Sequence, residues 1–192
     1  MTYDQFIQSK LVKYQDSGFD VDIESLNGKL FAWQRQIVKW ALAKGKCAIF
    51  ADCGLGKTAM QLEWAHQVHI KTGKPVLIIA PLAVSAQTIL EGVKFGIEVV
   101  NVKDESIIPI KITNYEQLEH INQEDYSGVV LDESSILKNY TGQTKRLLIE
   151  MFECHEYKLA CTATPSPNDI NEIGNHSEFL SIMDSADMAP LS

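Results

Sequence analysis

The sequence AIFADCGLGKTAMQLEWA, residues 48–65, joins an apolar run to a helix-like stretch through a turn that contains Gly54 and Gly56. Glycine permits backbone torsions that side chains forbid, so successive N–H groups of such a turn can face one anion. The N-terminus of the following helix adds a partial positive charge. Lys57 and Thr58 stand at that N-terminus, where a lysine reaches phosphate oxygens and a hydroxyl ligates Mg²⁺. The stretch therefore predicts a phosphate-binding loop.

Short all-apolar segments alternate with amphipathic ones along the rest of the chain. Strands that are apolar on both faces and alternate with helices predict a parallel sheet covered on both sides. The predicted strands are 47–51, 76–80, 99–102, 110–113, 128–132 and 158–163, and the predicted helices are 2–13, 33–43, 57–70, 83–95, 115–119 and 141–152. The expected fold class is α/β, a three-layer P-loop NTPase domain with a mainly parallel sheet.

A second polar cluster supports this site, because ligands of parallel sheets collect at the carboxyl ends of the strands. Asp132 and Glu133 close the apolar run VVL, and Thr162 and Thr164 follow another strand. A carboxylate at such a strand end suits a magnesium-holding role, and an adjacent glutamate can orient and deprotonate the attacking water. A strand that ends in solvated acids is the plain alternative, which the nearby phosphate loop disfavours.

Composition narrows the class of protein. The 192 residues suit one domain, with 45% hydrophobic and 22% charged residues as in an ordinary soluble chain. No apolar run approaches the roughly 20 residues that cross a bilayer, and the polar N-terminus is not a secretory signal. The net charge of −8 weakens nonspecific nucleic-acid binding without excluding it. The four cysteines match no zinc pattern and are interpreted as reduced core thiols of a cytosolic protein.

Several other residues are interpreted as structural. Gly45 is a candidate C-cap of the helix over 33–43. Trp40 and Trp64 are expected in the core rather than in stacking with nucleic acid. His66 and His69 are three residues apart with no third ligand nearby, which disfavours a metal site, and His155 and His176 are expected at the surface.

Six ordered motifs together resemble the first RecA-like lobe of superfamily two helicases, specifically its SWI/SNF-like branch. The motifs are LFAWQRQIVKWAL (30–42), ADCGLGKT (51–58), IIAPLAVSAQT (78–88), KITNYEQL (111–118), VVLDESSILKN (129–139) and KLACTATPSPND (158–169). The segment NEIGNHSEFL also resembles phage-encoded members of this branch, so the resemblance implies a cytoplasmic protein of a bacterial or phage-infected cell. It further implies an N-terminal helical extension over 1–28, the helicase ATP-binding domain over 29–182, and a tail or truncation point over 183–192.

The resemblance implies a role for each matching residue. Lys57, Asp132 and Glu133 would be catalytic, and Thr58 and Asp132 would hold Mg²⁺. Residues that would bind ATP are Trp33, Gln34, Gly54, Leu55, Gly56, Lys57, Thr58 and Ala59, with Gln34 at the adenine edge. Residues that would contact the nucleic-acid backbone are Pro81, Ser85, Thr113, Asn114, Tyr115, Lys138 and Asn139. Residues that would couple nucleotide state to nucleic acid are Ser135, Thr162 and Thr164.

The sequence departs from the family pattern in three places. Ala51 replaces the first glycine of the phosphate loop, and ADCGLGKT has one residue fewer before its glycines than its relatives. Asp132-Glu133-Ser134-Ser135 replaces DEAH or DEAD, which affects the link between the two sites. Only 28 residues follow Thr164, too few for the family's second lobe of roughly 150 residues.

That second lobe supplies an arginine finger, and neither Arg35 nor Arg146 stands where the family has one. We therefore expect the chain to bind ATP and Mg²⁺ with little turnover, to contact DNA with little sequence specificity, and to need a second lobe or protein partner. One alternative is a nucleotide-binding interaction module that regulates a protein partner. Another is a P-loop ATPase or kinase that does not act on nucleic acid, which Gln34 and the TAT sequence disfavour.

Overall fold

The computed structural model describes residues 16–106, 108–134, 142–163 and 170–182. Some predictions lie outside these residues, namely those for the helix over 2–13, for Ser135, Lys138, Asn139 and Thr164, and for the tail over 183–192.

Six parallel strands form one open sheet, in the order β1-β6-β5-β2-β4-β3. The strands are β1 Lys46–Phe50, β2 Val76–Ile79, β3 Val99–Asn101, β4 Ile110–Thr113, β5 Gly128–Asp132 and β6 Tyr157–Thr162. All six predicted strands are therefore confirmed. The expected α/β class with a parallel sheet is confirmed as well.

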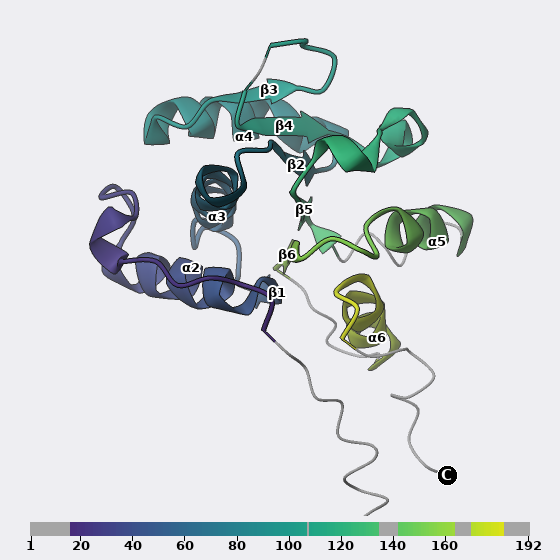
Figure 1. Ribbon diagram of the computed structural model, residues 1–192, viewed down its shortest axis with the longest axis horizontal. Helices are drawn as coiled ribbons and strands as arrows, with labels where there is room; N and C mark the ends of the chain where they lie inside the picture. The colour runs from purple at the N-terminus through teal and green to yellow at the C-terminus, as the bar shows by residue number, and fades with distance from the viewer. Residues whose placement is uncertain (1–15, 107, 135–141, 164–169, 183–192) are drawn as a thin grey trace, which may run out of the picture.

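Helices cover both faces of this sheet. They are α2 Ala32–Lys44, α3 Lys57–Thr72, α4 Leu82–Phe95, α5 Gly142–Met151 and α6 Ile170–Phe179, with 3-10 helices η1 Ile23–Ser25, η2 Tyr115–His120 and η3 Gln123–Asp125. Figure 1 shows α2, α3 and α4 on one face and α5 and α6 on the other. Among the described residues, no helix combines the length and the apolar character that a membrane span requires.

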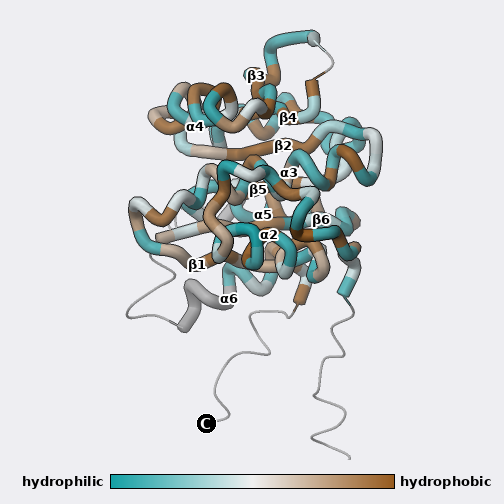
Figure 2. The backbone as a smooth tube through the Cα atoms, turned by 90° about the vertical axis from the view of Figure 1, so that its left-hand side faces the viewer, coloured by the Kyte–Doolittle hydropathy of each residue, from teal (hydrophilic) through white to brown (hydrophobic). Residues whose placement is uncertain are grey.

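Each layer of helices encloses its own apolar core. Against α2 and α3 the core includes Val38, Met60 and Trp64, none of which is exposed. Against α5 and α6 it includes Phe152 and Phe179. Between them, β2 is buried at every position, and Figure 2 shows its backbone in the colour of hydrophobic residues. A strand that is apolar on both faces thus packs against both layers.

The chain before α2 packs on this domain from residue 16 onward. The backbone N–H of Phe19 donates to the carbonyl of Leu42 over 2.9 Å, and the Phe19 ring meets Tyr157 edge-on at 5.7 Å. Leu26 and Leu30 are buried. This segment includes the 3-10 helix η1, where the Asp22 side chain accepts from the Glu24 N–H and caps a single turn.

Some structural expectations are confirmed and others need correction. Gly45 ends α2 with φ 74°, and Trp64 is fully buried, as predicted. Trp40, expected in the core, is instead 48% exposed and lines a hollow with Phe50 of β1 and His176 of α6. His176 is buried rather than superficial, and His155 is half-buried, with its ring Nε2 3.1 Å from the carbonyls of Gln123 and Tyr126.

The cysteine interpretation holds for only two of the four thiols. Cys47 and Cys161 lie in the core, and burial raises the pKa of Cys47 to about 12, so it stays a neutral thiol. Cys53 and Cys154 are exposed, because they lie in the phosphate loop and after α5.

Candidate nucleotide site

Strand register brings the predicted motifs to one edge of the sheet. On β1, Phe50 pairs with Thr162 of β6, and Asp132 of β5 pairs with Cys161 of β6. The three strands are neighbours and parallel, so their carboxyl ends stop at the same level. The phosphate loop, Glu133 and Ala163 therefore lie just beyond the carboxyl ends of three neighbouring strands.

The loop after β1 has the backbone conformation that a phosphate cradle requires. Gly54 has φ 82° and Gly56 has φ 73°, both in the region that glycine adopts without strain. Gly56 caps α3 with no side-chain hydrogen bond, so the first N–H groups of the helix stay open to a ligand. Leu55 is 43% exposed, whereas Ala59, in the first turn of α3, is buried in the apolar core.

Lys57 folds back over its own loop. Its Nζ donates to the carbonyl of Ala51 over 2.8 Å and to that of Asp52 over 3.3 Å. These contacts hold a cation beside the open N–H groups of α3. Thr58 follows in the first turn and is half-buried. A triphosphate entering this cradle would exchange the two carbonyls for its own charged oxygens.

Gln34 supports the loop from α2. Its Oε1 accepts from the N–H of Phe31 over 2.9 Å, and its Nε2 donates to the carbonyl of Leu55 over 3.0 Å. The side chain is only 5% exposed, while the neighbouring Trp33 is 42% exposed. Both ends of the amide are thus engaged with backbone, and each end keeps one further hydrogen-bonding position, a second N–H and a second lone pair.

Asp132 lies at the end of β5, 6% exposed. Burial raises the pKa of its carboxyl, and the hydrogen bond from Gln61 opposes this shift. The Gln61 Nε2 donates to Asp132 Oδ1 over 2.7 Å, and the N–H of Glu133 donates to the same oxygen over 3.1 Å. Lys57 also lowers the pKa of Asp132 through its positive charge. The phosphate loop and this carboxylate therefore share one electrostatic environment.

Glu133 and Ser134 connect this carboxylate to the neighbouring elements. The Thr162 hydroxyl donates to Glu133 Oε1 over 2.8 Å, which joins β6 to the end of β5. The Ser134 hydroxyl donates to the carbonyl of Cys161 over 3.2 Å and lies 2.7 Å from His176 Nε2 on α6. Local sequence patterns give no sign of this contact with His176.

The residues expected to contact nucleic acid divide into two groups. Pro81 and Ser85, at the start of α4, are half-buried and lie next to the end of β2. Thr113, Asn114 and Tyr115 have buried side chains, and their contact with a nucleic-acid backbone stays a prediction.

Tyr115 and Asn114 have structural partners. The Tyr115 hydroxyl donates to the carbonyl of Asp132 over 2.9 Å and so supports the end of β5. The Asn114 side chain accepts from the N–H of Glu116 over 3.0 Å and caps η2. These two bonds stabilise the backbone at the end of β5 and at the start of η2.

Gln61 and His176 lie at the site, although no prediction from the sequence included them. A signal for Gln61 was present, because it follows Thr58 by three positions and therefore lies on the same face of a helix. For His176 the helix itself was not predicted, since Asn171, Gly174 and Asn175 have poor helix propensity. Packing of Phe179 into the core compensates for that weakness.

The residues present fit a magnesium–nucleotide ligand. Two glycines with positive φ leave the cradle free of side chains, and a Cβ on Gly54 would meet nothing within 4 Å. A hydroxyl (Thr58) and a carboxylate (Asp132) are the oxygen ligands that Mg²⁺ prefers, directly or through water. This combination of a cradle, a lysine and an acidic strand end defines the class of P-loop NTPases.

The chain belongs to the DEAD/DEAH box helicase family, whose pattern it matches over residues 31–173. It is similar to the mouse DNA annealing helicase and endonuclease ZRANB3, with 26% identity over 163 residues that cover 74% of this chain and 15% of that protein. The predicted resemblance to a helicase lobe of the SWI/SNF-like branch is thereby confirmed.

The fold is similar to those of two solved helicase-type proteins. The Sulfolobus solfataricus SWI2/SNF2 ATPase core in complex with dsDNA aligns with a TM-score of 0.73 and 21% identity, over 87% of this chain and 39% of that one. The UvsW helicase of bacteriophage T4 aligns with a TM-score of 0.66 and 13% identity, over 96% of this chain and 66% of that one. The chain thus spans less than two thirds of the relatives that it matches.

Proposed function

We propose that this chain is the ATP-binding lobe of an ATP-dependent DNA helicase or translocase. The observation that carries the proposal is the junction of three motifs at one sheet edge, where Thr162 bonds to Glu133 and Lys57 influences Asp132. A nucleotide bound at this junction would contact residues at the ends of several strands at once. Membership of the DEAD/DEAH box helicase family supports nucleotide binding as the first step.

In this proposal each part of the site has one role toward ATP. The open N–H groups of α3 and the Lys57 ammonium bind the phosphate tail, and Gln34 reads the adenine edge. Thr58 and Asp132 would hold Mg²⁺, which neutralises phosphate charge when bound. Glu133 orients the attacking water and accepts its proton, while Thr162 fixes the glutamate.

DNA would bind at the same edge of the sheet. Pro81 and Ser85 stand at the start of α4, whose N-terminus provides open N–H groups for a phosphate. Contacts of this kind carry no base information, so we propose low sequence specificity. Efficient hydrolysis would need a second lobe that supplies an arginine, worth about 10³ to 10⁵ in rate in related phosphoryl transfers.

Fluorescence anisotropy with labelled DNA tests this proposal. We expect the chain to bind DNA of unrelated sequences with similar affinity, weakened by salt, and to change that affinity when Mg²⁺ and ATP are added. Lys57→Ala should retain DNA binding but lose the response to ATP. DNA binding that is absent, or indifferent to ATP in the wild-type chain, would favour the interaction module instead.

A further inference from the structure

Gln61 is a buried amide that no predicted motif includes. It lies on α3, four positions after Lys57, and is fully buried. Its Nε2 stands 2.7 Å from Asp132 Oδ1, and the two residues are 71 positions apart in the chain. The bond therefore ties the helix that begins at the phosphate loop to the strand that carries the acidic pair.

The chemistry of the pair fixes the orientation of the amide. An ionised carboxylate only accepts hydrogen bonds, so the NH₂ group of Gln61 must face Asp132. The opposite end, Gln61 Oε1, is buried and has no hydrogen-bond partner among the described residues. A buried acceptor without a partner is unfavourable for stability. This cost indicates that the donor end is what the site requires.

The two donors that Asp132 receives both reach the same oxygen. Gln61 Nε2 and the Glu133 N–H share Oδ1, while no described residue donates a hydrogen bond to Oδ2. Two donors on one oxygen fix the plane of the carboxylate. They leave Oδ2 as the oxygen available to a metal-bound water.

We propose that Gln61 is a positioning residue that orients Asp132 toward the Mg²⁺ of the nucleotide, an inference that rests on the proposed function. Partners that orient a metal-binding carboxylate in this way strongly affect metal affinity. Gln61 touches neither nucleotide nor metal in this role. It acts only through Asp132, from the helix that also carries Thr58.

The same helix offers a matched control. Gln67 Nε2 donates to Glu63 Oε1 over 2.9 Å, and both of these side chains are buried. This glutamine–carboxylate bond is of the same kind, but it lies two turns further along α3 and has no contact with Asp132. Gln61→Met and Gln67→Met therefore each remove one buried amide donor and replace it with an apolar side chain of similar length.

Calorimetry of nucleotide binding, with Mg²⁺ and with EDTA, separates positioning from packing. We expect Gln61→Met to lower the gain in ATP affinity that Mg²⁺ provides by about tenfold or more, the range for lost partners of metal ligands. Affinity in EDTA should stay the same, and Gln67→Met should retain the full Mg²⁺ gain. An equal Mg²⁺ gain in all three proteins would overturn the proposal.

A double-mutant cycle in urea adds a measurement that needs no ligand. Gln61→Met should lower the unfolding midpoint less in an Asp132→Ala background than in the wild-type protein, whereas the effect of Gln67→Met should be the same in both. Additive effects of the Gln61 and Asp132 changes would overturn the coupling.

The two measurements distinguish the two proposals. If the wild-type chain takes up no nucleotide with or without Mg²⁺, the proposed function fails, and the metal-positioning role fails with it. The urea cycle then still reports whether Gln61 and Asp132 are coupled. If nucleotide binds with a normal Mg²⁺ gain in Gln61→Met, only the positioning role fails.

Discussion

Thr162 donates a hydrogen bond to Glu133 across the ends of two neighbouring strands, with 2.8 Å between Oγ1 and Oε1. Thr162 is fully buried on β6, and Glu133 has φ 53°, in the left-handed region that non-glycine residues seldom adopt. The bond thus holds a glutamate whose backbone is under strain. It also connects the predicted coupling residue of one motif to the predicted water-orienting residue of another.

Replacing Thr162 by Val should weaken this connection while keeping the volume of the side chain. We expect a loss of about 1 kcal/mol in the free energy of unfolding, because a hydrogen bond to a partly solvated charged group is removed. Urea denaturation measures the loss. Thr162→Ser, which keeps the hydroxyl, is the control, and a loss as large from serine would assign the effect to packing instead.

Alanine at the two loop glycines should have unequal effects. Gly54 and Gly56 share a positive φ, which costs alanine roughly 1 kcal/mol or more. At Gly56 the added Cβ would also lie 2.4 Å from Gln34 Nε2, whereas at Gly54 it would meet nothing within 4 Å. Gly56→Ala should therefore lower the thermal midpoint more than Gly54→Ala. Equal midpoints for the two variants would show that the Gln34 side chain moves away from the added Cβ without a cost in stability.

Lys158 should make stability depend on pH in the alkaline range. It is buried on β6, and its Nζ donates to the Phe179 carbonyl and the Ser181 hydroxyl beyond the end of α6. Burial lowers its pKa from 10.5 to about 8. Below pH 8 both the folded and unfolded states carry the proton, and the buried charge is a constant cost. Between pH 8 and 10.5 only the unfolded state keeps the proton, so the free energy of unfolding rises with pH.

The comparison is with Lys158→Met, which does not titrate. Relative to this variant, the wild-type chain should gain up to roughly 3 kcal/mol across that pH window. Urea midpoints between pH 7 and 10 measure the difference. Parallel pH profiles for the two proteins would mean that the Lys158 pKa is close to its ordinary value.

Gln34 distinguishes base recognition from loop support. Its amide joins Phe31 to Leu55 in this structure, and the adenine role predicted from sequence would use the second N–H and the second lone pair of the same amide. We expect Gln34→Leu to reduce the preference for ATP over GTP by about tenfold, the effect of roughly 1.4 kcal/mol of lost pairing. Competition binding measures the ratio. A parallel loss for both nucleotides would leave Gln34 with loop support alone.

Much of this fold follows from local sequence patterns, because each buried strand is a continuous apolar run bounded by polar residues. The run VLII at 76–79 and the run GVVLD at 128–132 are buried on both faces, as their composition predicts. The glycines of the phosphate loop likewise predict positive φ angles there. The features that could not be predicted from local sequence are contacts between distant segments, such as Gln61 with Asp132 and Ser134 with His176.

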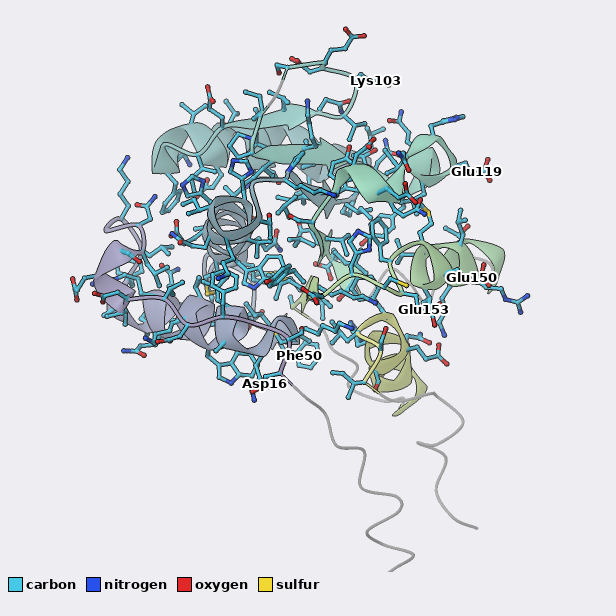
Figure 3. All side chains as sticks on the ribbon, viewed as in Figure 1. Asp16, Phe50, Lys103, Glu119, Glu150 and Glu153 are labelled. Carbon is cyan, nitrogen blue, oxygen red and sulfur yellow. The ribbon has the colours of Figure 1, made fainter. Side chains whose placement is uncertain are left out.

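His176 shows why such contacts cannot be predicted from local sequence patterns. Its helix has poor local propensity, and its ring meets that of Phe50 edge-on at 5.5 Å. Figure 3 labels Phe50 at the end of β1, between α2 and α6. Phe50 ends an apolar strand and is 47% exposed, and nothing in the local sequence indicates that its ring contacts a histidine far along the chain. The bond from the Tyr115 hydroxyl to the Asp132 carbonyl is another contact between distant segments that no local pattern predicts.

Titration calorimetry with ATP and Mg²⁺ tests the central claim most directly, that the loop from Ala51 to Thr58 binds the triphosphate. We predict saturable binding of one nucleotide by the wild-type chain and loss of that binding in Lys57→Ala, with no change in Lys103→Ala, which alters an exposed lysine elsewhere. The absence of heat from the folded wild-type chain, or equal binding by Lys57→Ala, would contradict the account.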